Sequence, residues 1–260
     1  MTAASLVKDQ YAADRDLTLR NRSSLTANRN LLYWYRELYR AQFADCGDPN
    51  QIRILEIGSG VSPLKHFHDN VLTSDVLELD YLDYVFDCHV IDRFDPIEDE
   101  SLDIIALTNV LHHLQSPIDF LNKAAGKLKR NGKIIATEPY FSFLSTFIFK
   151  YLHHEPVDFG IAEPVLAEVH GPLASANIAL PWLIFFQRPQ WLDRLRESYN
   201  FDERTFPTFS SISYMATGGI SRRLPIPHAI YRALFRLDLI LSRALPGLLA
   251  SFFTLTLTRK

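Results

Sequence analysis

Hydrophobic residues in the first half of the chain form short runs, and segments with helical spacing separate them. The runs predict buried strands, because each is short and ends at glycine or at polar residues. The predicted strands span residues 52–57, 71–76, 84–86, 104–108 and 133–137. Strands that alternate with helices favour parallel pairing through right-handed crossovers. The pattern therefore predicts a doubly wound α/β sheet.

The helix ahead of the last of these strands has the clearest boundaries. Ser116 is a candidate N-cap, and Pro117 suits the first helical position. Basic residues within 127–130 suit the last turn, and the Asn-Gly pair at 131–132 is typical of a helix end. The sequence therefore predicts a helix from Pro117 to about residue 130.

Other segments flank this core. Residues 25–43 carry an apolar stripe at helical spacing and predict an amphipathic helix. Residues 141–188 are rich in aromatic residues and proline, which favours an insertion or a lid. A basic helical stretch follows Gly219, and alternation over 252–258 predicts a last strand.

Composition narrows the class of protein. The chain has 260 residues with 27 Lys+Arg and 30 Asp+Glu, a net charge of −3, so no chain-wide basic field favours nucleic acid. Cys46 and Cys88 are too few for a disulfide framework and indicate free thiols. No signal-peptide pattern or apolar run of about 18 residues occurs. We expect a cytoplasmic protein, with peripheral membrane contact left open.

Polar residues follow the ends of four predicted strands, where open parallel sheets bind their ligands. The first strand ends in Gly58-Ser59-Gly60, and glycine lets the backbone turn tightly beside a ligand. Asp75 ends the second strand and is placed to accept hydrogen bonds from ribose hydroxyls. Asp87 follows the third strand and can accept a hydrogen bond from the adenine amine. Asn109, with His112 and His113, follows the fourth strand.

These residues resemble the class I S-adenosylmethionine-dependent methyltransferases, specifically the subgroup with a type 11 methyltransferase domain. The glycine-rich motif 56–60, Asp75, Asp87 and the segments 96–103 and 109–114 match that family's motifs in order. The resemblance covers about residues 50–140 and implies a seven-stranded, mostly parallel, Rossmann-like sheet. It implies S-adenosylmethionine as cofactor, bound by Glu56, Gly58, Ser59, Gly60, Asp75, Asp87, Cys88 and Asn109.

The expected organisation is a single methyltransferase domain over residues 1–260 in four parts. They are a helical cap at 1–48, a cofactor-binding half at 50–140, a lid or insertion at 141–188, and the remaining sheet with a basic C-terminal helix at 189–260.

Two other functions compete with methyl transfer. An NAD(P)-dependent oxidoreductase needs a third glycine in its fingerprint, and Pro63 stands at that position. A non-catalytic nucleotide-binding accessory protein is the second alternative.

The candidate catalytic residues are His112, His113 and Glu138. Their two strands should be neighbours, so His112 is the expected base and Glu138 the residue that orients it. A competing interpretation is that a histidine of this pair only shapes the cofactor pocket. The segment His153-His154-Glu155 is interpreted as a polar lid that faces substrate, and no metal site is expected, because adjacent histidines rarely bind one ion.

The acceptor is expected to be an oxygen of a small molecule, a glycan or a lipid-linked intermediate. The aromatic run at 140–149 is interpreted as core or lid packing, or else as a pocket for an apolar acceptor. Arg232, Arg236 and Arg243 lie on one face of the C-terminal helix. Such a helix can lie on an anionic membrane. It can equally pack on the sheet with a solvated basic face, and the oligomeric state is left open.

Overall fold

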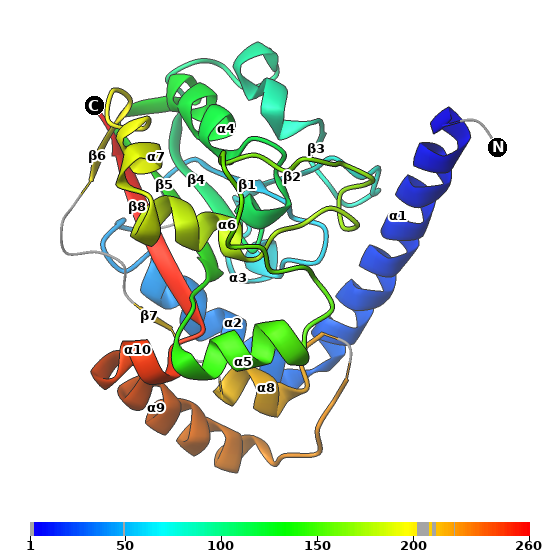
Figure 1. The fold of residues 1–260 in the computed structure, drawn as a ribbon, viewed down its shortest axis with the longest axis vertical. Coiled ribbons are helices and arrows are strands. Elements are labelled where there is room, and N and C mark those ends of the chain that lie inside the picture. The colour runs from blue at the N-terminus through cyan, green and yellow to red at the C-terminus, as the bar shows by residue number, and fades with distance from the viewer. Residues whose placement is uncertain (1–2, 49, 202–207, 210–211, 221) are drawn as a thin grey trace.

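The structure is a computed structural model that describes residues 3–48, 50–201, 208–209, 212–220 and 222–260, with side chains from residue 9 onward except that of residue 208. Its centre is one β-sheet with helices against both faces (Figure 1). The strands are β1 Ile54–Ile57, β2 Leu72–Asp75, β3 Tyr84–Val85, β4 Leu102–Thr108, β5 Leu128–Pro139, β6 Tyr199–Phe201, β7 Thr208–Phe209 and β8 Phe252–Arg259.

Strand pairing confirms the predicted fold class. Among the described residues, seven strands pair in the order β3-β2-β1-β4-β5-β8-β6, and the short β7 also pairs with β8. Six of the seven run in one direction, whereas β8 is antiparallel to both β5 and β6. The chain order reverses between β1 and β4, and this switch point is where doubly wound sheets bind ligands.

Helices pack on both faces of the sheet. The α-helices are α1 Ala3–Ala27, α2 Arg29–Gln42, α3 Leu64–Phe67, α4 Pro117–Ala124, α5 Phe143–Tyr151, α6 Ala179–Trp182, α7 Pro189–Asp193, α8 Ile212–Thr217, α9 His228–Ala244 and α10 Pro246–Leu249. Within the described residues there are also three 3₁₀ segments, η1 Cys88–Arg93, η2 Leu111–His113 and η3 Ala125–Lys127, and one π-helical turn, η4 Leu183–Gln187.

Two apolar cores hold these layers together. On one face, Phe120 of α4, Leu180 of α6 and Trp191 of α7 are buried against the strands. On the other face, Trp34 of α2 and Phe235 of α9 are buried. Both faces of β1, β4 and β5 are therefore covered, which explains the continuous apolar runs of their sequences.

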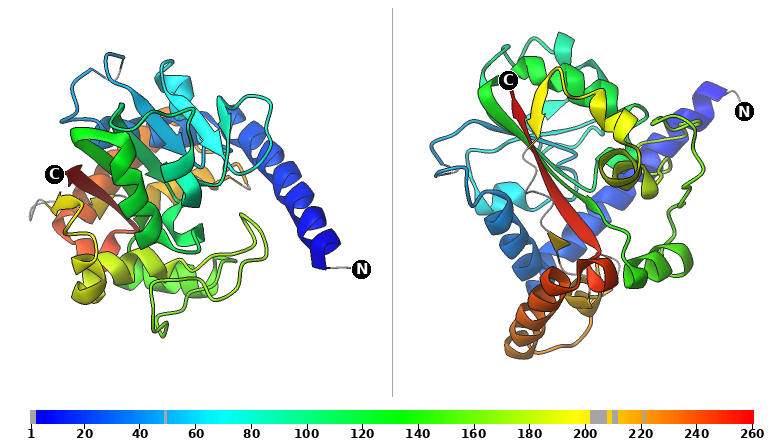
Figure 2. Two further views of the ribbon diagram at one scale, coloured as in Figure 1. Left: turned by 90° about the horizontal axis from the view of Figure 1, so that it is seen from above. Right: turned by 60° about the vertical axis from the view of Figure 1, so that its left-hand side comes forward.

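The predicted helical cap consists of two helices. Asn28 joins them, and its side-chain oxygen accepts hydrogen bonds from the backbone N–H groups of Asn30 and Leu31, which caps α2. The apolar pattern predicts α2 but not α1, whose exposed positions carry no such stripe. Helix α1 lies along one side of the molecule with its N-terminal end pointing away from the sheet (Figures 1 and 2).

The boundaries predicted for the helix after Ser116 are partly wrong. Helix α4 ends at Ala124, and Lys129 belongs to β5 instead of a last helical turn. Ser116 precedes the helix but makes no side-chain cap hydrogen bond. Leu128 pairs with Leu102 of β4, so strand pairing starts early and overrides the local helical preference.

The segment at 141–188 divides into dissimilar parts. Helix α5 opens it, and residues 152–177 follow without regular helix or strand. Ile178, Leu180 and Ile184 are then buried in the same core as β4 and β5. Across the described residues, none of the helices is both long and apolar enough to cross a membrane.

Candidate active site

The glycine-rich turn after β1 lies against the turn after β4. Gly58 has a φ of +75°, and a Cβ there would lie 2.4 Å from Cγ2 of Val110. A Cβ on Gly60 would lie 2.8 Å from Cγ2 of Thr18 and 3.0 Å from Oδ2 of Asp75. The left-handed backbone of Gly58 therefore requires glycine, and the space at Gly60 is tight. The turn brings the backbone close to the ends of β2 and β4.

Glu56 lies within β1, one residue before its end, and its carboxyl group is buried, 1% exposed. Its Oε1 accepts a hydrogen bond from the Ser62 hydroxyl at 2.5 Å, whereas Oε2 has no hydrogen-bond partner among the described residues. Burial raises the pKa of Glu56 to about 7, although hydrogen bonds from Ser62 and Ser59 and the charge of Arg22 oppose the shift. A buried oxygen without a donor suits a ligand that brings its own N–H groups.

Asp75 ends β2 as the resemblance implies for the ribose-binding acid. Its Oδ2 accepts the Gly60 N–H at 3.0 Å, and its Oδ1 accepts the Leu77 N–H at 3.1 Å. Burial raises its pKa, and these backbone donors lower it. Ser59 binds the neighbouring strand, because its N–H donates to the Ser74 carbonyl at 2.9 Å. Ser59 thus holds β1 and β2 together at the glycine-rich turn.

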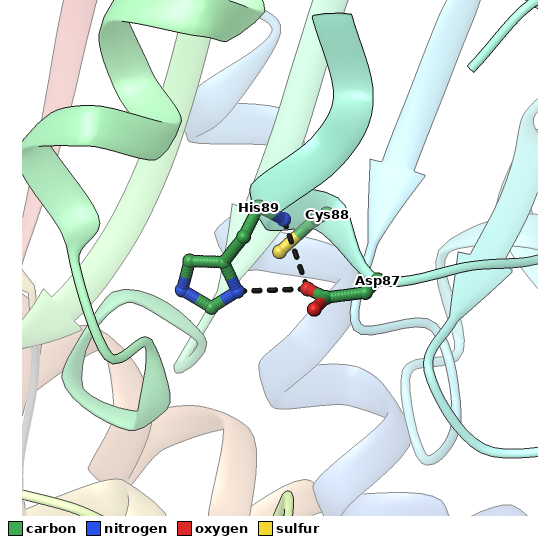
Figure 3. Close-up of side chains that lie close together, drawn as sticks. All are labelled: Asp87, Cys88 and His89. Atoms are coloured by element: carbon green, nitrogen blue, oxygen red, sulfur yellow. Dashed lines mark hydrogen bonds and ion pairs between the residues drawn. The ribbon is translucent and has the colours of Figure 1, made fainter. Parts of the chain in front are cut away.

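Asp87, Cys88 and His89 lie at the start of η1, just beyond β3 (Figure 3). Oδ1 of Asp87 lies 2.7 Å from Nδ1 of His89 and accepts the His89 N–H at 2.9 Å. The hydrogen bond from His89 lowers the pKa of Asp87, so its carboxyl group is ionised at neutral pH. Cys88 is buried, and burial raises the pKa of its thiol. The ionised Asp87 is a suitable acceptor for an exocyclic amine.

Asn109 follows β4 in a left-handed conformation with a φ of +57°. Its N–H donates to the Thr137 carbonyl at 2.8 Å, which fixes the turn. Its Oδ1 is buried without a hydrogen-bond partner among the described residues. Asn109 and Glu56 therefore offer two buried acceptor atoms near one switch point.

His112 and Glu138 meet as predicted, because η2 follows β4 and Glu138 lies in the neighbouring β5. Nδ1 of His112 lies 2.6 Å from Oε2 of Glu138. The other oxygen of Glu138 accepts the N–H groups of Val110 at 2.8 Å and Leu111 at 2.7 Å. Both side chains are buried, at 3% and 0% exposure. Glu138 therefore fixes both the imidazole ring and the backbone that carries it.

Glu155 approaches the same histidines from the segment after α5. Its Oε2 lies 3.4 Å from Nε2 of His112, and its Oε1 lies 3.6 Å from Nε2 of His113. Nδ1 of His113 lies 2.9 Å from the Ser175 carbonyl, to which it donates. Glu155 is absent from the catalytic residues that the sequence predicts, and its only signal is the polar triplet at 153–155.

The three groups carry different charges at neutral pH. Burial lowers the pKa of His112, but Glu138 and Glu155 outweigh burial and raise it to about 10. Burial and the charge of His112 lower the pKa of His113 to about 4. Burial raises the pKa of Glu155, yet the hydrogen bond and charge of His112 lower it to about 2. His112 is thus an imidazolium, His113 a neutral imidazole and Glu155 a carboxylate.

Helix α1 covers the glycine-rich turn, a contact that the sequence pattern does not predict. Arg22 donates from Nη1 to the Ser62 carbonyl at 3.1 Å and lies 4.1 Å from the ring centre of Tyr81. The Tyr81 hydroxyl donates to the Gly60 carbonyl at 2.6 Å. Nearer the N-terminus, buried Asp14 accepts the Leu173 N–H at 3.0 Å. Helix α1 therefore joins the glycine-rich turn to the segment that carries Glu155.

Comparisons with known proteins agree with this geometry. A family described as a methyltransferase domain, type 11, matches residues 55–136. A comparison with curated proteins gives no match.

Similar solved structures include a chain of the Haloferax volcanii complex that contains the Trm112 methyltransferase activator. It is 12% identical, covers 96% of this chain and 96% of its own, and has a TM-score of 0.50, which supports the fold. An S-adenosylmethionine-dependent methyltransferase from Archaeoglobus fulgidus is 14% identical, with 86% and 94% coverage and a TM-score of 0.47. One from Mesorhizobium loti is 12% identical, with 85% and 97% coverage and a TM-score of 0.45.

The sheet order and the glycine-rich turn at the switch point are those of the class I methyltransferase fold. The family match supports S-adenosylmethionine-dependent methyl transfer. The match to the methyltransferase domain family covers residues 55–136 of the 260. S-Adenosylmethionine is thus the cofactor, and the residues present suit it. Its ammonium group and ribose hydroxyls are donors, and Glu56 and Asn109 leave buried acceptors unpaired. The family match decides the nucleotide alternatives in favour of the sulfonium cofactor over NAD(P).

Proposed function

We propose that the protein transfers the methyl group of S-adenosylmethionine to a hydroxyl oxygen of a small-molecule, glycan or lipid-linked acceptor. We assign cofactor binding to Glu56, Gly58, Ser59, Gly60, Asp75, Asp87, Cys88 and Asn109. When bound, the cofactor supplies a methyl group on a positively charged sulfur. The buried His112–Glu138 pair is the observation that supports an oxygen as the methyl acceptor. An oxygen nucleophile must lose a proton as it is methylated, and a histidine can take that proton.

The position of His112 relative to the cofactor turn supports this role. Val110, two residues before His112, is the side chain that a Cβ on Gly58 would strike. The turn that leads to His112 therefore packs against the glycines that we assign to cofactor binding. Glu138 fixes Nδ1, which leaves Nε2 as the only atom of the ring that can exchange a proton with an acceptor.

The position of Glu155 determines whether His112 can act as a base. In the structure, both nitrogens of His112 face carboxylates, and the imidazolium holds its proton. We propose that the acceptor takes the place of Glu155 beside Nε2 and that the ring first releases the Nε2 proton to solvent. The acceptor hydroxyl then donates its proton to Nε2 while its oxygen takes the methyl group. Glu138 keeps the ring oriented throughout.

Substitution of each histidine separates the catalytic from the pocket-shaping interpretation. His112→Asn should lower turnover by about 10²-fold or more, the usual contribution of a general base. Affinity for S-adenosylmethionine should stay within about twofold, because no cofactor acceptor is removed. His113→Asn is the matched control and should lower turnover less, because its Nδ1 is held by the Ser175 carbonyl. Equal losses of turnover and of cofactor affinity in His112→Asn would show that His112 only shapes the cofactor pocket.

The acceptor is sought with methyl-labelled S-adenosylmethionine and three probes, namely a catechol, a free oligosaccharide and a polyprenyl-phosphate-linked sugar. Mass spectrometry of the product locates the methyl group. Label on a hydroxyl oxygen of any probe supports the proposal. Label on nitrogen or carbon, or on no probe although cofactor binds, contradicts it.

A further inference from the structure

One end of the molecule exposes apolar side chains from three helices, α5, α9 and α10, which lie together in Figure 1. Helix α10 contacts both of the others. These helices and their C-terminal cap residues carry nine of the seventeen large apolar side chains that are exposed among the described residues. We name this surface the α5–α9–α10 face, and its exposed apolar residues are Phe143, Phe147, Tyr151, Leu152, Ile230, Leu237, Ile240, Leu245 and Leu248.

Helix α9 carries apolar residues on two sides, one that faces the protein and one that faces solvent. Its inner side buries Tyr231 and Phe235 against the sheet layer. Its outer side exposes Ile230, Leu237 and Ile240 at 61%, 54% and 65%. Their spacing places them on one helical face. A helix that only packed on the sheet would show polar residues there.

Helix α5 continues the same surface with aromatic residues. Phe143, Phe147 and Tyr151 lie four residues apart and are 78%, 54% and 71% exposed. Phe149 points inward and is 7% exposed. The aromatic run at 140–149 thus serves core packing only in part, because its second stripe faces solvent. Exposed aromatic stripes are typical of surfaces that insert into the boundary between lipid head groups and acyl chains.

The charged residues of these helices are almost all basic. Arg232, Arg236 and Arg243 are exposed on α9, and Lys150 is exposed at the end of α5. The only acidic residue in α5, α9 and α10 is Asp238, which is 2% exposed and accepts the Ser213 N–H at 2.7 Å. The face therefore presents positive charge on a chain whose net charge is −3.

We propose that the α5–α9–α10 face docks on an anionic lipid membrane. Apolar residues for insertion, arginines beside them and the absence of exposed acids match a surface of anionic head groups. A second copy of this chain would suit the α5–α9–α10 face less well than a membrane. A two-fold interface would bring eight cations together, four from each copy, without an exposed acid from these helices to compensate.

The docking face is continuous with the candidate active site. Helix α5 begins four residues after Pro139, the end of the strand that carries Glu138, and Leu152 lies three residues before Glu155. A membrane under α5 would therefore lie beside the segment that covers His112. Docking favours the lipid-linked class among the proposed acceptors, although docking itself does not depend on methyl transfer.

The test is co-sedimentation of the purified full chain with vesicles. Phosphatidylcholine vesicles and vesicles with one third phosphatidylglycerol are compared at low and high salt. The protein should sediment with the anionic vesicles and be released by salt, because head-group attraction is screened. Phe147→Ser/Ile240→Ser should abolish sedimentation, since both side chains are exposed and their loss leaves the core intact.

A charge variant tests the arginines separately. One arginine near an anionic surface contributes about fivefold to partitioning, so Arg236→Gln/Arg243→Gln should lower it by roughly 25-fold. Arg40→Gln/Arg93→Gln is the matched control, because these arginines are 66% and 81% exposed on other elements. The control should sediment like the unmodified chain.

Three results would overturn the proposal. They are no sedimentation with anionic vesicles, equal sedimentation of all variants, and a stable dimer in light scattering that Phe147→Ser/Ile240→Ser dissociates. Affinity for S-adenosylmethionine, measured without vesicles, should be the same in every variant. Failure of docking is thereby distinguished from failure of the methyltransferase function.

Discussion

Glu56 provides the most quantitative prediction, because its carboxyl group is buried and its pKa is raised from 4.5 to about 7. The folded protein binds this proton more tightly than the unfolded chain does, so stability falls as pH rises from about 4.5 to 7. A rise of the pKa from 4.5 to about 7 corresponds to about 3 kcal/mol. Most of that loss, about 2–3 kcal/mol, falls between about pH 5 and 8.

Glu56→Gln removes this titration and keeps the size of the side chain. Urea unfolding at pH 5, 6, 7 and 8 gives the free energy of unfolding of each protein. The variant should gain about 2–3 kcal/mol relative to the unmodified chain as the pH rises from about 5 to 8. Other groups titrate equally in both proteins and cancel in the difference. Glu98→Gln, at an exposed loop residue, is the control for the same change of side chain outside the core.

A pH-independent difference between Glu56→Gln and the unmodified chain would refute the buried-carboxyl account. The same variant probes the cofactor site. If the ammonium group binds at Oε2, the affinity of the unmodified chain should increase as pH rises through about 7, and this increase should be absent in Glu56→Gln.

Further substitutions and conditions test the rest of the site. Gly58→Ala should destabilise the fold by about 1–3 kcal/mol from its left-handed backbone, measured by urea unfolding, and Val110→Ala should not restore the loss because it relieves only the clash. Glu155→Gln should lower the pKa of His112 and reduce the stability that is lost as pH rises from about 6.5 to 10; an unchanged pH profile of unfolding would contradict the His112–Glu155 contact. EDTA should leave turnover unchanged, whereas a loss that a divalent cation restores would show that His112, His113 and Glu155, whose ligand atoms lie within 4.8 Å of one another, bind a metal.

Sequence patterns predict the parts of the site that depend on local backbone chemistry. Gly58 is recognisable because its left-handed backbone favours glycine, and Gly60 because a side chain there would crowd Thr18 and Asp75. The meeting of His112 with Glu138 follows from two strands that are adjacent in an alternating α/β pattern, and the 2.6 Å contact confirms it. Their catalytic roles stay predictions until turnover is measured.

The parts that sequence alone misses depend on tertiary packing. Helix α1 has no apolar stripe, because its site-facing residues, such as Asp14 and Arg22, contact backbone groups and not a core. Glu155 comes from residues 152–177, which lack regular structure, so no periodicity could place it beside His112. The early end of α4 has the same origin, since pairing with β4 decides it.

Calorimetric titration with S-adenosylmethionine, S-adenosylhomocysteine and NAD tests the central claim most directly. One equivalent of each sulfur compound should bind, and NAD should give no heat. Asp75→Ala should weaken both by at least about tenfold, since one lost charge-assisted hydrogen bond costs roughly 1.5–3 kcal/mol. Binding of NAD alone, or binding of the sulfur compounds that Asp75→Ala leaves unchanged, would contradict the cofactor site described above.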